Sequence, residues 1–283
     1  MERTLYVSDL DGTLLNDDEI VSNTSVEIIS SLIDRGILFT YATARAYSSA
    51  KKATEPLCFQ LPVATYNGAI IVDPVSGDIL EYSTINKSSI FQQIDQLLEF
   101  SICPLVYSLN NGKESVSWKK TQGNECNGII DFIGSRNSDI IFHQSYSATE
   151  LLSGELFYIA TVGNLETVNK CKSIFEHISD LSYCVQEDAY KNGLFWFEAF
   201  SVDATKDKSI KKLKRYAKAD RVISFGDNIN DIAMLQASDY SIAVGNAFPE
   251  LIKIADFVTG TNKQDGVAQW LLKNANVPKI YKS

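Results

Sequence analysis

Two acidic strings, each directly after a short apolar run, have the side chains needed for metal-assisted chemistry. The first string, SDLDGTLL at residues 8–15, follows an apolar stretch and places Asp9 and Asp11 two positions apart. Gly12 permits a tight turn with positive φ, and the Thr13 hydroxyl can hold that turn by hydrogen bonding. Carboxylates held together at a strand end are costly unless a cation or a reaction needs them. An ordinary solvated Asp-Gly turn is the alternative, but it does not account for the whole string.

The second string is FGDNIND at residues 225–231, again at the end of an apolar run. Asp227 and Asp231 can approach the first acidic pair if the two strands are neighbours. Such hard oxygen ligands suit Mg²⁺, which keeps several waters and shares oxygens with a phosphate. For Asp231 a second explanation stays open, in which Asn228 caps a helix and Asp231 interacts favourably with the helix dipole.

Two more features supply groups that can bind a phosphate. Residues 41–45 read YATAR, so the Thr43 hydroxyl and the backbone N–H groups that follow it stand at another strand end. Alone this feature is weak, and a purely structural role is the alternative. A cation is also required, because a phosphate and the carboxylates repel one another. Lys206, at the start of a lysine-rich helix, is placed to reach the cluster, whereas the other lysines form a solvated face.

Strands that alternate with helices must position these groups. Strand patterns fall at residues 4–8, 37–42, 61–66, 195–200, 221–225 and 240–244, and helical patterns at 24–35, 46–54, 206–217, 230–236, 248–254 and 266–273. This alternation predicts a parallel sheet covered on both faces. The alternation of strands and helices stops after about residue 83 and returns near residue 195, so the segment between reads as an insertion. We therefore predict an α/β protein: a Rossmann-like, doubly wound parallel core with an inserted α+β cap domain. The predicted boundaries are 1–83 and 194–283 for the core and 84–193 for the cap.

Composition sets limits on partners and location. The chain has 283 residues, of which 45% are hydrophobic and 22% charged, as in ordinary globular proteins. Its net charge of -9 opposes binding to nucleic acid and to anionic membranes. No apolar run approaches the roughly 20 residues of a membrane span. Five cysteines without a CxxC pair fit a reducing compartment, so we predict a cytoplasmic protein. The oligomeric state cannot be read from the sequence.

Taken together, the motifs resemble the haloacid dehalogenase superfamily and, within it, the Cof-type phosphatases. The resemblance rests on SDLDGTLL at 8–15, YATAR at 41–45, Lys206 and FGDNINDIAML at 225–235, with TYNGA at 65–69 as a further match. It covers the full length of the chain. Two positions depart from the family pattern, because Ala44 and Asp207 stand where glycine is usual.

The resemblance implies a role for each matching residue. Asp9 would be the nucleophile that forms an aspartyl-phosphate and also a Mg²⁺ ligand. Asp11 would bind Mg²⁺ through its backbone carbonyl, and its side chain would act as general acid and then as base. Asp227 would be a third ligand. The groups implied to hold the phosphate are Leu10, Thr43, Ala44, Lys206 and Asn230, and those in supporting positions are Gly12, Thr13, Arg45, Asn67, Gly68 and Asp231.

The function predicted from these residues is a Mg²⁺-dependent phosphatase that hydrolyses small phosphorylated metabolites, such as sugar phosphates. Its partner is therefore a small-molecule substrate, with no nucleic acid and no membrane. Two alternatives stay open at this point. A phosphomutase of the same fold also needs Asp9 and Asp11. A low-turnover regulatory protein that binds a phosphometabolite would keep the site but would not need the acid Asp11.

Overall fold

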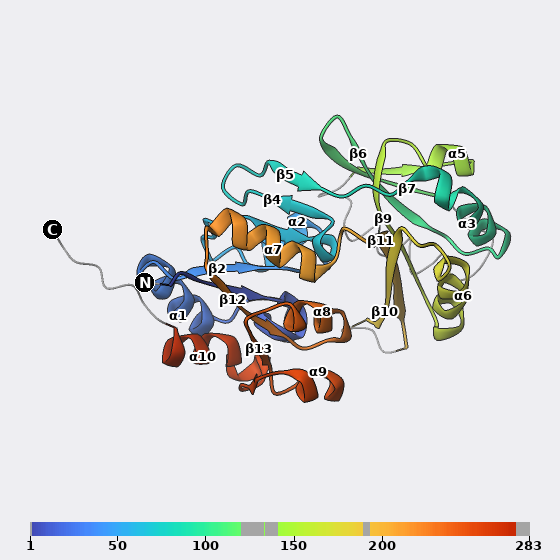
Figure 1. The fold of residues 1–283 in the computed structure, drawn as a ribbon. Coiled ribbons are helices and arrows are strands. Elements are labelled where there is room, and N and C mark those ends of the chain that lie inside the picture. The colour runs from blue at the N-terminus through green and yellow to red at the C-terminus, as the bar shows by residue number, and fades with distance from the viewer. Residues whose placement is uncertain (1, 120–132, 134–140, 189–192, 276–283) are drawn as a thin grey trace. The chain divides into compact units, whose positions relative to one another are not determined.

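The protein divides into two compact units in a computed structural model that describes residues 2–119, 133, 141–188 and 193–275. The first unit combines Met1–Glu81 with Thr205–Ser283, and the second is the continuous stretch Tyr82–Ala204. Figure 1 shows the helices and strands of both. Among the described residues, no helix combines the length and the hydropathy that crossing a membrane requires.

The first unit is built on a five-stranded parallel sheet in the order β14-β13-β12-β1-β2. Its strands are β1 (Thr4–Ser8), β2 (Leu38–Tyr41), β12 (Arg221–Gly226), β13 (Tyr240–Ala243) and β14 (Phe257–Val258). The central strands are buried on both faces, as expected for a parallel sheet covered by helices, and this explains their continuous apolar sequences.

Helices cover this sheet on both faces. They are α1 (Asn23–Asp34), α2 (Tyr47–Ala53), α7 (Lys206–Ala217), α8 (Ile232–Gln236), α9 (Pro249–Ile254) and α10 (Gly266–Asn274). The helices α1 and α10 pack against each other, and Figure 1 shows them on the face opposite α7. The arrangement is a Rossmann-like, doubly wound core, as the alternation of strands and helices predicted.

The strand order reverses between β1 and β12, and this reversal positions the site. From β1 the chain proceeds to β2 on one side, whereas β12 is followed by β13 and β14 on the other. Ligands of open α/β sheets bind outside the carboxyl ends of the strands at such a reversal. The two acidic strings of the sequence follow β1 and β12, so both lie at this point.

A small antiparallel sheet extends the first unit beyond β2. It consists of β3 (Val63–Thr65), β4 (Ile70–Val72) and β5 (Ile79–Tyr82), in that order. A parallel bridge between Ala42 and Ala64 joins β3 to the end of β2. The turn Tyr66–Gly68, which links β3 to β4, therefore lies beside the loop that carries Thr43.

The second unit has a six-stranded sheet in the order β10-β11-β9-β6-β7-β8. Its pairs are antiparallel except for the parallel pair of β7 and β8. Its elements are α3 (Lys87–Glu99), β6 (Leu105–Asn110), β7 (Lys113–Trp118), β8 (Ile141–Gln144), α5 (Ala148–Leu151), β9 (Glu155–Gly163), α6 (Leu165–Phe175), β10 (Leu181–Glu187) and β11 (Phe195–Ser201).

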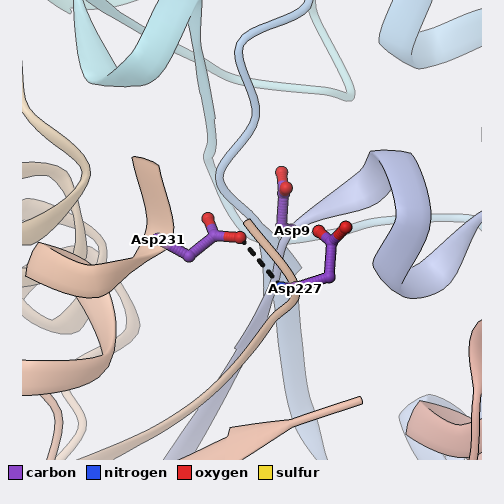
Figure 2. A group of neighbouring side chains, drawn as sticks. All are labelled: Asp9, Asp227 and Asp231. Carbon is purple, nitrogen blue, oxygen red and sulfur yellow. Dashed lines mark hydrogen bonds between the residues drawn. The ribbon is translucent and has the colours of Figure 1, made fainter. Parts of the chain in front are cut away.

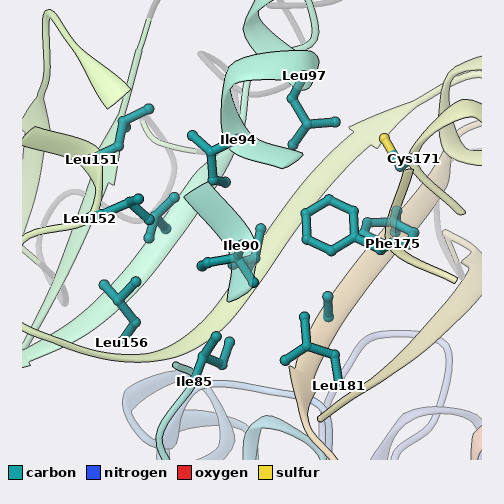
Figure 3. Packing of buried hydrophobic residues seen from close by; sticks show 14 of the residues in the cluster. Ile85, Ile90, Ile94, Leu97, Leu151, Leu152, Leu156, Cys171, Phe175 and Leu181 are labelled. Carbon is teal, nitrogen blue, oxygen red and sulfur yellow. The ribbon is translucent and has the colours of Figure 1, made fainter. Parts of the chain in front are cut away.

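A separate hydrophobic core stabilises the second unit. Aliphatic side chains of α3, such as Ile90 and Ile94, pack in one cluster with Phe175 of α6 (Figure 3). Phe197 of β11 belongs to the same cluster. The rings of Phe175 and Phe197 lie 5.3 Å apart between centroids. Because this core is independent of the first unit's sheet, the second unit has the α+β organisation predicted for the inserted cap.

One predicted domain boundary is wrong. The sequence placed the strand at residues 195–200 in the core, after a boundary at residue 193. In the structure this strand is β11, which pairs with β9 and β10 in the sheet of the second unit, and the first unit resumes only at Thr205. A strand buried on both faces has the same apolar sequence in either sheet, and this similarity caused the error.

Within the described part of the chain, no disulfide joins Cys58, Cys103, Cys171 or Cys184 to another of these four, and Cys126 lies outside the described residues.

Candidate active site

Two aspartates from neighbouring strand ends form the centre of the candidate site. In the parallel ladder Ser8 of β1 is paired with Phe225 of β12, and the backbone N–H of Asp9 continues it with a 3.0 Å hydrogen bond to the Phe225 carbonyl. This register brings Asp9 and Asp227 to the same edge of the sheet. Both are buried, with only 5% of Asp9 exposed. Figure 2 shows their carboxylates together with that of Asp231.

Asp231 completes a group of three carboxylates whose oxygens lie within 4.8 Å of one another. One of its oxygens, Oδ2, accepts hydrogen bonds from the backbone N–H groups of Asp227 and Asn228, both at 3.1 Å. Asp231 and Asn228 form a capping box at the start of the helical turn Ile229–Asp231. The capping explanation considered for Asp231 therefore describes part of its role.

Lys206 provides the positive charge at the centre of this group. Its Nζ donates to Asp231 Oδ1 at 2.6 Å and forms an ion pair with Asp9 Oδ1 at 2.9 Å. Lys206 is the first residue of α7 and is only 2% exposed. Of the lysines at the start of this helix, it is the one placed among the carboxylates, although Asp207 follows it where the family pattern has glycine.

The cluster holds three buried carboxyl groups and one ammonium group, and the pKa values of Asp9, Asp227 and Lys206 are shifted there. Burial raises the pKa of Asp9 well above its ordinary value, and the nearby Asp231 and Asp227 raise it further against the opposing effect of Lys206. Burial and Asp231 also raise the pKa of Asp227 to about 7. Burial opposes the charge on Lys206, but Asp231 and Asp9 outweigh it, so its pKa is raised as well.

These carboxylates fit a divalent cation. They are hard oxygen donors, crowded and desolvated, and one ammonium group does not balance three negative charges. Both oxygens of Asp231 are already bound, by Lys206 and by backbone N–H groups. Asp9 and Asp227 are therefore the better candidates to hold a metal, and Asp231 positions Lys206.

The turn after β1 is fitted closely around Asp227. The Thr13 hydroxyl donates a 2.9 Å hydrogen bond to Asp227 Oδ1. Gly12 has a φ of +71°, and a Cβ built on it would lie 2.3 Å from Asp227 Oδ2. The Gly12 carbonyl accepts a 2.8 Å hydrogen bond from Asn246 Nδ2. Both glycine properties, positive φ and absence of a side chain, are thus needed at this position.

The side chain of Asp11 is held by Arg45. Nε and Nη2 of Arg45 donate to the two oxygens of Asp11 at 2.7 and 2.5 Å, and Nη2 also contacts Glu19 Oε2 at 2.8 Å. The guanidinium group therefore bridges Asp11, at the end of β1, and Glu19. This fork arrangement is among the strongest and most specific of side-chain ion pairs.

The remaining predicted residues line the adjacent strand ends. Thr43 is buried, and its Oγ1 accepts a hydrogen bond from the Arg45 N–H at 3.2 Å. Asn67 is also buried and accepts a 3.3 Å hydrogen bond at Oδ1 from Asn230 Nδ2. Gly68 lies against the start of α7. Leu10 is fully buried, and Ala44 lies in the loop between Thr43 and Arg45.

The structure thus brings Asp9, Asp227, Asp231 and Lys206 into direct contact or close approach, whereas the Asp11 side chain lies with Arg45. The sequence did not single out Glu19 or Asn246. Glu19 stands in a polar run that carries no signal of its own. Asn246 comes shortly after the strand at 240–244, so its place at a strand end was a usable signal.

Comparison with known proteins defines the family. The sequence profile of the haloacid dehalogenase-like hydrolases matches residues 6–271, so the chain belongs to this family. The resemblance to its Cof-type phosphatases is confirmed, and the protein is an enzyme of the phosphatase class.

Individual relatives match along nearly their whole length. The phosphatase YwpJ of Bacillus subtilis is 28% identical over 286 residues, which cover 94% of this chain and 98% of YwpJ. The 5-amino-6-(5-phospho-D-ribitylamino)uracil phosphatase YitU of the same organism is 24% identical over 270 residues, 94% of this chain and 96% of YitU. Among solved structures, a haloacid dehalogenase-like hydrolase from B. subtilis aligns with a TM-score of 0.76 and 25% identity, covering 96% of this chain and 99% of that one.

Proposed function

We propose that the protein is a Mg²⁺-dependent phosphatase that hydrolyses small phosphorylated metabolites through a phosphate ester on Asp9. The observation that carries this proposal is the buried carboxylate of Asp9 at the reversal of strand order, with Lys206 on one of its oxygens and Asp227 beside it. Burial and mutual repulsion make the charged forms of two adjacent carboxylates costly. A metal and a lysine that together bind an anionic substrate account for both carboxylates.

In the first step, an Asp9 oxygen attacks phosphorus while the bond between phosphorus and the leaving oxygen breaks. Lys206 binds Oδ1 of Asp9, which leaves the other oxygen for the attack. Asp11 donates a proton to the leaving oxygen, so the product departs as a neutral alcohol. The intermediate is an acyl phosphate on Asp9.

In the second step, Asp11 takes a proton from a water molecule, which attacks phosphorus and breaks its bond to Asp9. Inorganic phosphate leaves, and Asp9 returns as a carboxylate. Arg45 donates to both oxygens of Asp11, an arrangement that suits the ionised form of the acid. Asp11 must therefore turn from Arg45 to carry a proton, and it can return to that ion pair between turnovers.

Mg²⁺ would be held by carboxylate oxygens of Asp9 and Asp227 and by the backbone carbonyl of Asp11. When bound, it offsets the repulsion between the substrate phosphate and the carboxylates. The hydroxyl of Thr43, the amide of Asn230, Lys206, and the backbone N–H groups of Leu10 and Ala44 would hold the transferring phosphoryl group. The Cβ of Ala44 leaves its backbone N–H available.

The substrate is proposed only as a class. The name of YitU specifies a phosphorylated ribityl compound as the substrate of that relative. Such a compound is a small phosphate monoester, in agreement with the class proposed for this chain. The residues of the first unit act on the phosphate itself, which all members of the class share, so they do not select one metabolite.

The two N-terminal aspartates provide the test, because the mechanism uses them differently. With p-nitrophenyl phosphate, Asp9→Asn should form no covalent adduct, because the attacking oxygen is lost. Asp11→Asn should form the adduct slowly and retain it, because no base activates the water. Acid quench after a single turnover, followed by mass spectrometry of peptides, measures both outcomes.

Asp17→Asn is the matched control, since Asp17 is an exposed aspartate paired with Lys263 near the same loop. It should turn over like the wild type and release free phosphate without a sugar bisphosphate activator, which a phosphomutase would require. An adduct on the Asp9→Asn protein, or an adduct mapped to Asp11 in the wild type, would reverse the proposed roles.

A further inference from the structure

The turn between β3 and β4 has an unusual backbone. Tyr66, Asn67 and Gly68 follow one another with φ values of 51°, 55° and 101°. Left-handed conformations are uncommon for residues other than glycine, and asparagine accepts them better than most. Backbone strain of this kind persists only where the surroundings hold it, and it is concentrated at functional sites. The contacts that hold this turn therefore point to a function for it.

The first contacts of the turn are with the loop after β2. The Asn67 backbone N–H donates to the Thr43 carbonyl at 2.9 Å, and the Tyr66 N–H donates to the Arg45 carbonyl at 3.1 Å. The backbone of the turn thus fixes both ends of the Thr43–Arg45 loop. This loop carries a hydroxyl and the N–H groups proposed to bind the phosphoryl group.

The second contact reaches across to the loop after β12. Asn230 Nδ2 donates to Asn67 Oδ1 at 3.3 Å. Asn230 Oδ1 is buried and has no hydrogen-bond partner among the described residues. Within that part of the chain, the hydrogen bond to Asn67 is therefore what fixes the plane of the Asn230 amide. A side-chain amide has two N–H donors, so this bond leaves one donor for a ligand.

The third contact is with the start of α7. A Cβ built on Gly68 would lie 2.9 Å from the Thr205 carbonyl and 2.9 Å from Ser209 Cβ. The backbone of the turn therefore packs directly on the first turn of the helix that carries Lys206. One short turn thus contacts the elements that carry Thr43, Asn230 and Lys206.

We propose that Asn67 is a positioning residue, which orients the amide of Asn230 so that its free N–H donates to the phosphoryl group. This inference rests on the function proposed above. The backbone N–H of Asn67 donates to the Thr43 carbonyl, and its side chain accepts the hydrogen bond from Asn230. The two roles can be separated, because a glycine at residue 67 keeps the left-handed backbone and its N–H but lacks the side chain.

The experiment compares Asn67→Gly, Asn230→Ala and the double variant in the full-length chain with Mg²⁺. For each, kcat and KM for p-nitrophenyl phosphate, the inhibition constant of inorganic phosphate, the Mg²⁺ concentration for half activation and the unfolding temperature are measured. Loss of one hydrogen bond should lower kcat/KM about three- to tenfold in Asn67→Gly and weaken inhibition by phosphate to a similar extent. The Mg²⁺ requirement should stay at the wild-type value.

The double variant distinguishes positioning from a general structural effect. If Asn67 acts through Asn230, then Asn67→Gly should change kcat/KM by less than about twofold when Asn230 is already alanine. Gly77→Ala is the control, because Gly77 also has a positive φ but its added Cβ would meet nothing within 4 Å. It should leave all the kinetic constants at their wild-type values.

Two results would overturn the inference. One is an Asn67→Gly protein with wild-type kcat/KM and phosphate inhibition, and the other is a double variant whose losses simply multiply. A wild-type protein that neither hydrolyses the substrate nor binds phosphate would overturn the proposed function, and the inference with it. That result is visible in the wild type alone, so the two failures are distinguished.

Discussion

Replacing Lys206 with methionine removes the ammonium group from the carboxylate cluster while keeping a side chain of similar length. The Nζ atom lies 2.6 Å from Asp231 Oδ1 and 2.9 Å from Asp9 Oδ1. At an effective dielectric constant of about 20, each contact corresponds to roughly 6 kcal/mol of Coulomb attraction. The cost of burying the ammonium offsets part of this attraction. Measured losses on removing one partner of a buried pair are about 3–5 kcal/mol.

We therefore expect Lys206→Met to lower the free energy of unfolding by about 3–5 kcal/mol without Mg²⁺. For a unit of this size, that corresponds to a decrease of roughly 6–20 °C in the unfolding temperature. Thermal unfolding followed by circular dichroism at pH 8, with EDTA, measures it. Lys211→Met is the control, because Lys211 is exposed and 3.9 Å from Asp207, where a pair contributes at most about 1 kcal/mol.

The loss should depend on pH in a defined direction. Burial first, then Asp231, raises the pKa of Asp9 in the folded protein. A carboxyl group whose pKa is raised on folding contributes stability at low pH, and this contribution is lost as the pH rises through its folded pKa. Without Lys206 the carboxylates should protonate more readily, so the deficit should be smaller at pH 5 than at pH 8. If Lys206→Met had the same unfolding temperature as the control Lys211→Met at pH 8, this account of the cluster would be refuted.

Two further predictions concern the metal and the first turn. Because burial raises the pKa of Asp227 to about 7, metal binding must displace a proton below that pH. The increase in unfolding temperature on adding Mg²⁺ should therefore be larger at pH 8 than at pH 6, and equal increases would exclude Asp227 as a ligand. Gly12→Ala should abolish most phosphatase activity, because its Cβ would lie 2.3 Å from Asp227 Oδ2. Gly77→Ala, with φ at +81° but open space around it, should cost a little stability and no activity, and equal activity of the two variants would contradict the close fit at Gly12.

The meeting of Asp9 with Asp227 could be predicted from the sequence because one physical rule connects them. Both follow apolar strands, and parallel strands end at the same edge of a sheet, so their order along the chain did not matter. The position of Lys206 followed from charge balance, since three carboxylates and a phosphate need a cation and this lysine begins the helix nearest that edge. Asp207 did not disturb it, because the Asp207 side chain lies toward Lys211 on the exposed side.

Other features depend on contacts that a local pattern does not encode. The sequence FWFEAFS of β11 is apolar because its strand is buried, but burial does not specify which sheet covers it. The pairing of Arg45 with Asp11 and Glu19 depends on side-chain conformations in two loops. The left-handed backbone of Tyr66 has no residue-type signal, because tyrosine rarely adopts it.

The division of the first unit into two chain segments determines when the site can exist during synthesis. Residues that precede the second unit supply Asp9, Asp11 and Thr43, whereas Lys206, Asp227 and Asp231 all follow it. The continuous stretch Tyr82–Ala204, with a core of its own, is made between them. When residue 204 has been translated, the nascent chain contains Asp9 and both β1 and β2. The strand β12, which pairs with the other edge of β1, has not yet been made. Asp227 and Asp231 are translated after Lys206. The three carboxylates therefore cannot come together before the lysine that pairs with Asp9 and Asp231 is part of the chain.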